Sequence, residues 1–233
     1  VAANYTQSVI PILLSVWAMS YIERFFKKYV PDTLTTVFTP FLTMIVSLPV
    51  SLCALAPLGS WLGNGFAAFF EFIGSQGGVV AVFGAGLLAA LWLPMIISGM
   101  HVAVIMVAIA NFMLTGVDSF ILPATTISLW SVYGCEVASW IKLRNKEEKS
   151  LCLGYVTANM IGGVGEPFIY GMMFRYRRLF PCTMAGSFVA GAVAMALGVN
   201  VYVMAASNVL NVLAFVGGDA QNFINMAIAA AAG

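Results

Sequence analysis

The sequence predicts an all-α membrane protein with polytopic transmembrane helices and re-entrant hairpins. Of its 233 residues, 61% are hydrophobic and only 8% are charged, and the mean hydropathy is +0.97. Such a chain has too few polar side chains to cover a water-facing surface, so lipid is its expected exterior. The ten basic residues fall in clusters between apolar runs, and such clusters indicate the cytoplasmic face.

Composition also narrows the kinds of site that the chain can carry. No basic patch suggests nucleic acid, and the formal net charge is only +1. The four cysteines are scattered, without Cys-x-x-Cys spacing and away from the single histidine, so we expect neither a metal, a cofactor nor a disulfide. The sequence begins at Val1 without an initiator Met or the parts of a signal peptide, and we interpret it as a segment of a longer protein.

The first apolar runs predict two long helices. The run 4–28 ends in a charged cluster in which Glu23 precedes Lys27 by four residues, the favourable order for a helical ion pair. Pro31 then interrupts the chain. The run 36–58 is long enough to cross a bilayer, because about 20 residues at 1.5 Å each span the hydrocarbon core. Its three prolines are expected to bend it.

The middle of the chain predicts an interfacial helix followed by further apolar helices. Residues 59–78 mix aromatic, polar and acidic side chains, a composition typical of a helix lying in the interface. Apolar runs follow at 79–97, at 102–114, which is short for a full crossing, and at 121–141. The most charged stretch of the chain, 142–149, comes next and predicts a cytoplasmic loop.

The segment 150–174 is predicted to enter the membrane and return. Basic clusters flank it on both sides, and both clusters favour the cytoplasm, so a single crossing would place one of them outside. A re-entrant hairpin with Glu166 near its tip satisfies both clusters; a single span with one basic cluster outside is the alternative. Two further spans are expected at 180–197 and 199–216, and 218–233 is expected to begin another helix.

The stretch Gly162–Gly171 carries one carboxylate, Glu166, among glycines and a proline. An ionisable residue in a membrane segment costs about 2.5–3.5 kcal/mol on insertion scales, so it usually faces a polar cavity and marks a ligand or ion pathway. Glycine and proline around it predict broken backbone, which is tolerated at this depth only where protein or a cavity surrounds it. Three other carboxylates, Glu71, Asp118 and Glu136, are expected at the interface, although Glu136 falls inside an apolar run.

Five elements of the sequence occur in the order found in one family. They are Ser8-Val9-Ile10-Pro11-Ile12 through Trp17, Tyr21-Ile22-Glu23-Arg24-Phe25 with Pro31-Asp32, Pro57-Leu58-Gly59 with Leu62-Gly63, Gly99-Met100-His101, and Gly162–Gly171 followed by Phe174-Arg175-Tyr176-Arg177-Arg178. In these residues the chain resembles the membrane-embedded IIC component of sugar phosphotransferase systems, in the β-glucoside, sucrose and trehalose branch of the glucose superfamily. The chain departs from the family at Gly165, where Thr is usual, and at Val102, where Trp or His is common.

The resemblance implies a sugar permease that binds its cargo and presents it to a partner domain, which phosphorylates it. It implies a homodimer in a bacterial inner or plasma membrane, in which 1–233 forms one IIC-type domain without its first helices. Residues 1–75 would hold the end of the dimerisation half and the interfacial helix, and 79–233 the sugar-transport half. IIB and IIA domains would be partners, because the Cys-x-Thr-Arg type motif that carries the phosphoryl group is missing from this sequence.

The resemblance also implies the candidate site. The signature glutamate and the histidine of the Gly-Met-His element line the sugar site in the family, and they correspond to Glu166 and His101. Glu166 would orient sugar hydroxyls and act as a base, and burial would favour that role; the alternative is a carboxylate that only caps nearby amides. Gly163, Gly165 and Asn159 could offer backbone amides or a side-chain amide to the sugar, or could serve helix packing and the broken backbone alone.

Two functions from other classes remain open on the sequence alone. An ion- or proton-coupled secondary sugar transporter would use Glu166 and His101 as a proton relay and release unmodified substrate. An intramembrane enzyme would use Glu166 as acid or base, but the sequence offers no nearby carboxylate or nucleophile as its partner.

Overall fold

The computed structural model describes residues 9–233, in which every regular element is helical apart from one isolated bridge between Asp118 and Val201. The prediction of an all-α protein is confirmed. The start of the predicted run 4–28, with Ser8 of the first family element, lies outside the described residues. The chain forms two compact units, one up to Ala68 with Met95–Val107, and one of Phe69–Pro94 with Ala108–Gly233. The functional halves expected at 1–75 and 79–233 stay a prediction.

The first unit begins with an antiparallel pair of helices, α1 (Val9–Tyr29) and α2 (Asp32–Val50), which pack against each other. Glu23 and Lys27 form the expected ion pair, with an Oε1–Nζ distance of 2.7 Å. Lys27 and Lys28 lie in the last turn of α1, where positive charge is favourable beside the carbonyl end of a helix.

The helix α2 continues without a break through a π-helical turn, η1 (Ser51–Leu55), into α3 (Ala56–Gln76). In that turn the amide of Ala56 donates to the carbonyl of Ser51, five residues back. Prolines just before and just after the turn supply no amide hydrogen, and a widened turn is one way in which a helix accommodates this loss. Leu34–Gly59 is long and apolar enough to cross a membrane, as expected for 36–58, and the helix continues without a break into the region predicted to be interfacial.

The next two helices match the predicted runs 79–97 and 102–114. They are α4 (Gly78–Ser98) and α5 (His101–Thr115). Gly99 separates them with a φ of +72°, in the left-handed region that glycine enters at little cost. Gly78–Ser98 is long and apolar enough to span a bilayer, whereas α5 is a shorter apolar helix.

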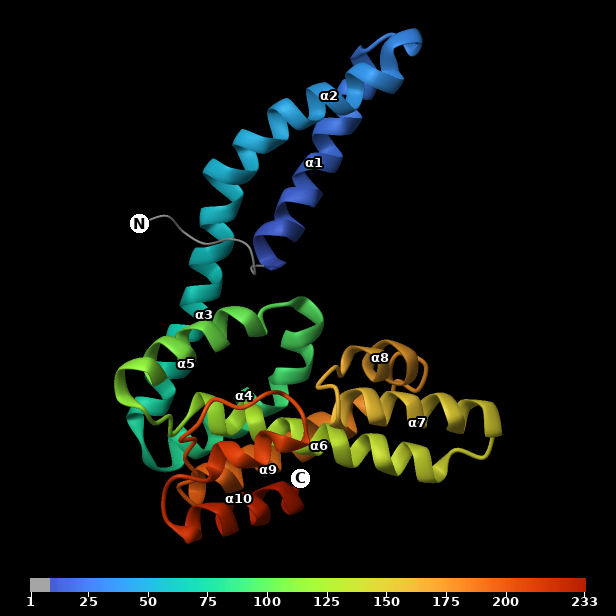
Figure 1. Cartoon of the computed structure of the whole chain (residues 1–233). Helices are drawn as coiled ribbons and strands as arrows, with labels where there is room; N and C mark the ends of the chain where they lie inside the picture. Colours follow the sequence, from blue (N-terminus) through green and yellow to red (C-terminus); the bar gives the residue numbers. More distant parts are fainter. Residues whose placement is uncertain (1–8) are drawn as a thin grey trace. The chain divides into compact units, whose positions relative to one another are not determined.

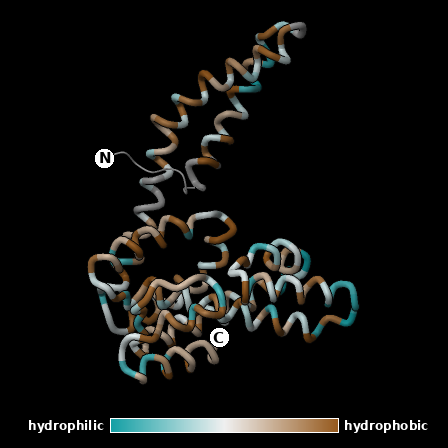
Figure 2. Tube along the Cα trace, in the orientation of Figure 1, coloured by the Kyte–Doolittle hydropathy of each residue, from teal (hydrophilic) through white to brown (hydrophobic). Residues whose placement is uncertain are grey.

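The second unit is built around α6 (Ile121–Lys142), which packs on α9 (Leu179–Ala196) and on α10 (Ala220–Ala232) (Figure 1). A further helix, α7 (Lys146–Met160), lies alongside α6. Figure 2 shows hydrophilic residues at the turn between α6 and α7, and the cytoplasmic side predicted for 142–149 stays a prediction.

Glycines bring α9 close to α4 within this unit. A Cβ added to Gly191 would lie 2.6 Å from the Cβ of Ala89 and 2.8 Å from the carbonyl oxygen of Ala85. A Cβ on Gly86 would meet the carbonyl oxygen of Phe188 at 2.8 Å. The two helices therefore approach each other through small residues, as helices in membranes commonly do.

One of the predicted spans differs from the structure. Leu179–Ala196 is long and apolar enough to cross a bilayer, as expected for 180–197. The span predicted at 199–216 is wrong: this stretch contains the bridge at Val201, an irregular loop and the short 3₁₀ helix η3 (Val209–Phe215). Gly198, with a φ of +69°, follows α9 and the chain then turns. The helix expected within 218–233 is present as α10.

Candidate functional site

The segment after α7 folds back along that helix. The helix ends at Met160, an irregular loop covers 161–165, and two short helical pieces follow, α8 (Glu166–Phe168) and η2 (Ile169–Met173). Just after these pieces, Arg175 forms an ion pair with Glu148 at the start of α7, and the Tyr176 hydroxyl donates to the Glu148 carboxylate at 2.7 Å. The chain thus leaves the charged turn and returns to it, which is the path of a hairpin; its entry into a membrane stays a prediction.

Two backbone hydrogen bonds fix the loop 161–165, which we call the glycine loop. The amide of Gly163 donates to the Asn159 carbonyl at 2.8 Å, and the amide of Val164 donates to the Ala158 carbonyl at 3.2 Å. Gly163 has a φ of +73°, and a Cβ there would lie 3.1 Å from the Ser207 carbonyl oxygen. This position therefore needs glycine both for its backbone conformation and for its close contact.

The loop 207–208 packs against the glycine loop and is held by α6. The Tyr133 hydroxyl on α6 donates to the Ser207 carbonyl at 3.3 Å. The Asn208 side-chain amide donates to the Ile161 carbonyl, also at 3.3 Å. The stretch that was expected to be a membrane span thus supports the signature region instead.

A buried polar pair lies beside the glycine loop. Asn159, near the end of α7, donates from Nδ2 to Oε1 of Glu136 on α6 at 2.7 Å. The exposed fraction is 1% for Asn159 and 0% for Glu136. Glu136 is therefore buried inside the protein, and its expected position at the membrane interface stays a prediction. The signal for burial was its place inside an apolar run; its partner, 23 residues away, could not be found from spacing.

The same asparagine contacts the third predicted glycine. A Cβ on Gly165 would lie 3.3 Å from Asn159 Nδ2 and 3.4 Å from its Oδ1. The structure therefore brings Asn159, Gly163 and Gly165 together. What each contributes to sugar binding is not tested by this geometry and stays a prediction.

Glu166 follows directly after this cluster, as the first residue of α8. Its side chain is exposed, so the burial expected for it is not found. Pro167 occupies the first turn of the short helix, where the missing amide hydrogen costs nothing. The carboxylate accepts no side-chain hydrogen bond within residues 9–233, and the alternative of a carboxylate that caps neighbouring amides has no support there.

His101 belongs to the other compact unit, at the first position of α5. Its Nδ1 lies 3.3 Å from the Met95 carbonyl oxygen. A carbonyl can only accept, so the Nδ1 nitrogen carries a proton where this contact is a hydrogen bond.

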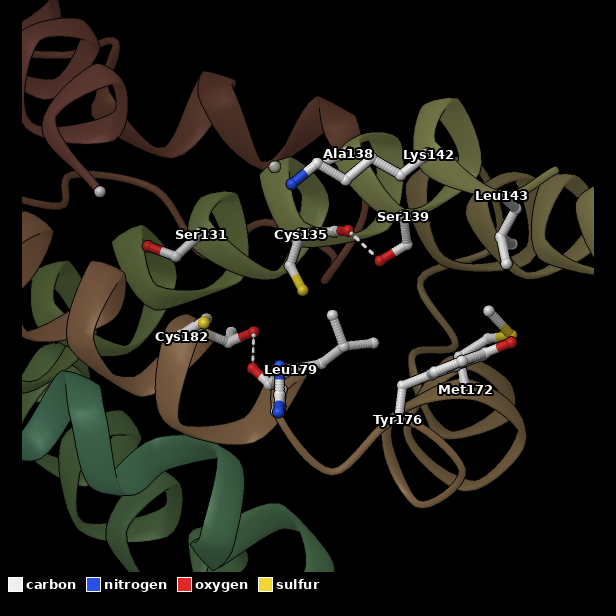
Figure 3. Close-up of a pocket in the computed structure, with 14 residues that line it drawn as sticks. Ser131, Cys135, Ala138, Ser139, Lys142, Leu143, Met172, Tyr176, Leu179 and Cys182 are labelled. Atoms are coloured by element: carbon white, nitrogen blue, oxygen red, sulfur yellow. Dashed lines mark hydrogen bonds between the residues drawn. The ribbon is translucent and has the colours of Figure 1, made fainter.

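A cavity of about 560 Å³ lies elsewhere in the second unit, between α6 and the chain that leads into α9 (Figure 3). Lys142 and Arg178 are the cations on its lining, and Cys135 and Cys182 contribute thiols. None of the five predicted site residues lines it. The cavity is therefore distinct from the glycine loop.

The Tyr176 phenol at the base of the hairpin titrates in a way that can be measured. Tyr176 is exposed, and its hydrogen bond to Glu148 raises the pKa of the phenol above its ordinary value. Because a raised pKa favours the protonated phenol, this contact contributes stability below the ordinary tyrosine pKa and loses it as pH rises through the higher folded value. We expect Glu148→Gln to lower the pKa of Tyr176 towards the ordinary value.

Phenolate absorbance follows this titration, with Tyr176→Phe subtracted to isolate one residue. A midpoint for Tyr176 that Glu148→Gln leaves unchanged would show that the contact does not form in solution.

Three relatives illustrate what the chain is similar to. It is 28% identical over 92% of its length to a PTS system arbutin-, cellobiose-, and salicin-specific EIIBC component of Escherichia coli (strain K12), of which it covers 44%. It is 32% identical over 87% of its length to a PTS system beta-glucoside-specific EIIBCA component of Bacillus subtilis (strain 168), covering 32% of that protein. It is 30% identical over 87% of its length to a PTS system sucrose-specific EIIBC component of Salmonella typhimurium, covering 43%.

The chain thus spans less than half the length of these curated relatives. No solved structure gives a significant match. The family model described as "Phosphotransferase system, EIIC" matches residues 1–186, which include the Gly-Met-His element, the glycine loop and the basic turn after it. With this match and helical segments long enough to cross a bilayer, the chain belongs to the EIIC family of the phosphotransferase system, whose members are integral proteins of the bacterial plasma membrane.

Proposed function

We propose that this chain is the sugar-translocating part of a phosphoenolpyruvate-dependent phosphotransferase system and that its cargo is a glucoside or a disaccharide. Membership of the EIIC family is the observation that carries the proposal. The named specificities of its relatives, β-glucosides, cellobiose and sucrose, favour the substrate class.

In this function Glu166 and His101 contact the sugar. The exposed carboxylate of Glu166 can accept hydrogen bonds from two hydroxyls at once, and the imidazole of His101 contacts a further part of the sugar. Asn159, Gly163 and Gly165 line the approach to Glu166. A carboxylate that holds a hydroxyl in place is also placed to take its proton as the phosphoryl group arrives.

Phosphoryl transfer requires a partner. The relatives named above are fused EIIBC or EIIBCA components, and we propose that IIB and IIA domains, fused to this chain or separate, carry the phosphoryl group. The chain would supply the bound sugar and no phosphorylated residue of its own. We propose that it works as a homodimer in lipid. The basic residues Arg175, Arg177 and Arg178 lie beside the hairpin base, where an anionic phosphorylated partner could dock.

The test uses the full-length protein in sealed vesicles with the soluble phosphotransferase components. A panel of labelled salicin, cellobiose, sucrose and trehalose is supplied, and the internal product is separated by chromatography. We expect uptake only with phosphoenolpyruvate and delivery of sugar phosphate. Free sugar that accumulates on an ion gradient without the phosphoryl donor would establish the secondary-transporter alternative.

A further inference from the structure

We propose that Glu136 is a positioning residue for the glycine loop: its buried carboxyl group holds the Asn159 side chain beside Gly165 and thereby sets the path of the chain into Glu166. The proposal rests on the proposed function for its effect on sugar uptake. Its structural part concerns the order of the loop and can be tested without any sugar.

The hydrogen bond between Glu136 and Asn159 is strong evidence for a positioning role because both side chains are buried. Both side chains are almost fully removed from solvent, and they come from different helices, α6 and α7. A buried polar group that loses its partner is costly, because it cannot bond to water instead, so the pair strongly favours one arrangement of the two helices. An exposed pair at the same distance would be worth much less.

Asn159 transmits this constraint in two ways. Its side chain, held by Glu136, fills the space next to Gly165. Its main-chain carbonyl accepts the amide of Gly163. A shift of Asn159 would therefore displace the loop at both Gly163 and Gly165, and Glu166 directly follows Gly165.

The unused hydrogen-bonding atoms indicate which chemistry position 136 needs. Oε2 of Glu136 and Oδ1 of Asn159 are buried and have no partner among the described residues. Within residues 9–233 Glu136 forms no ion pair. A glutamine at 136 offers an oxygen to the Asn159 amide and an N–H group to its oxygen. The positioning role therefore predicts that Glu136→Gln retains function, whereas a role in charge or proton movement predicts that it does not.

The experiment compares Glu136→Leu and Glu136→Gln in the full-length protein in nanodiscs. Hydrogen exchange of the amides at 161–165 reports loop order, and uptake of labelled salicin gives KM and the maximal rate. We expect Glu136→Leu to speed loop exchange at least about 10-fold and to raise KM about 10-fold, the size expected for a lost buried hydrogen bond. Glu136→Gln should stay within about twofold of the wild type in both measurements.

The control is Thr125→Val, a near-isosteric change of a buried residue on α6 whose hydroxyl bonds only to Ile121 and Leu122 of its own helix. It should change neither loop exchange nor KM. If Glu136→Leu does not yield folded protein, Glu136→Met replaces it, because the flexible methionine side chain adapts to the same space.

Two results would overturn the proposal. One is unchanged exchange at 161–165 in Glu136→Leu or Glu136→Met. The other is a Glu136→Gln protein that is ordered in the loop but fails to transport, which would assign the carboxylate itself to transport. A wild type that takes up no sugar while loop exchange responds as expected would instead count against the proposed function alone.

Discussion

Glu166→Gln abolishes sugar uptake, with a loss of about 100-fold or more, if the carboxylate holds the sugar as proposed. Two charge-assisted hydrogen bonds to hydroxyls are worth about 1.5–3 kcal/mol each, and the neutral amide weakens both. The amide also cannot take a proton from the attacking hydroxyl. The side chain of Glu166 is exposed and forms no hydrogen bond or ion pair within the described residues, so the variant is expected to insert and fold normally.

Uptake into vesicles with phosphoenolpyruvate measures this effect, and sugar binding to the same protein separates loss of binding from loss of transfer. Glu147→Gln is the matched control, because Glu147 is an exposed carboxylate in the first turn of α7 and away from the glycine loop. Wild-type uptake by Glu166→Gln would remove Glu166 from the mechanism. Equal losses in both variants would point to general charge rather than to the site.

Gly191→Leu is expected to lower stability strongly, because α9 and α4 touch at this residue. Even a single carbon would lie 2.8 Å from the Ala85 carbonyl oxygen, a backbone atom that can move only with its helix. Overpacking of this kind typically costs about 1–3 kcal/mol, and four added carbons place this variant at the upper end or beyond. A fall in Tm of roughly 5–10 °C follows for a domain of this size.

The control is Gly154→Leu on α7, where an added Cβ meets nothing within 4 Å. The same substitution in open space removes a flexible residue from a helix and should stabilise it by about 0.5–1 kcal/mol. Thermal unfolding of the purified full-length variants measures both. Equal melting temperatures for the two leucine variants would mean that α4 and α9 do not pack through Gly191.

Hydropathy and charge predicted most of the helical path, because both act locally along the chain. The Glu23–Lys27 pair, α4 and the return of the chain after α7 were all predictable from spacing or from the position of basic clusters. The clearest failure has a physical cause. Hydropathy is a sum over side chains, so it cannot show that the backbone at 199–216 forms its hydrogen bonds outside a helix.

Some residues of the candidate site were likewise predictable from the sequence, and others were not. A run of glycines around one carboxylate marks a special backbone, so the residues of the loop were predictable from their order in the chain. The role of Glu136 was not predictable, because it depends on a hydrogen bond from an asparagine on another helix. Tyr133 was missed for the same reason, since the carbonyl that it binds belongs to Ser207.

The contact of Asn159 with both Glu136 and Gly165 also limits how this chain can be recombined with its relatives. A chimera that exchanges only 162–171 would bring a foreign residue to position 165 while keeping the asparagine that occupies the adjacent space. Any side chain larger than glycine there would press on that amide. Specificity grafts should therefore move positions 136, 159 and 165 as one unit, even though they lie in three separate stretches of sequence.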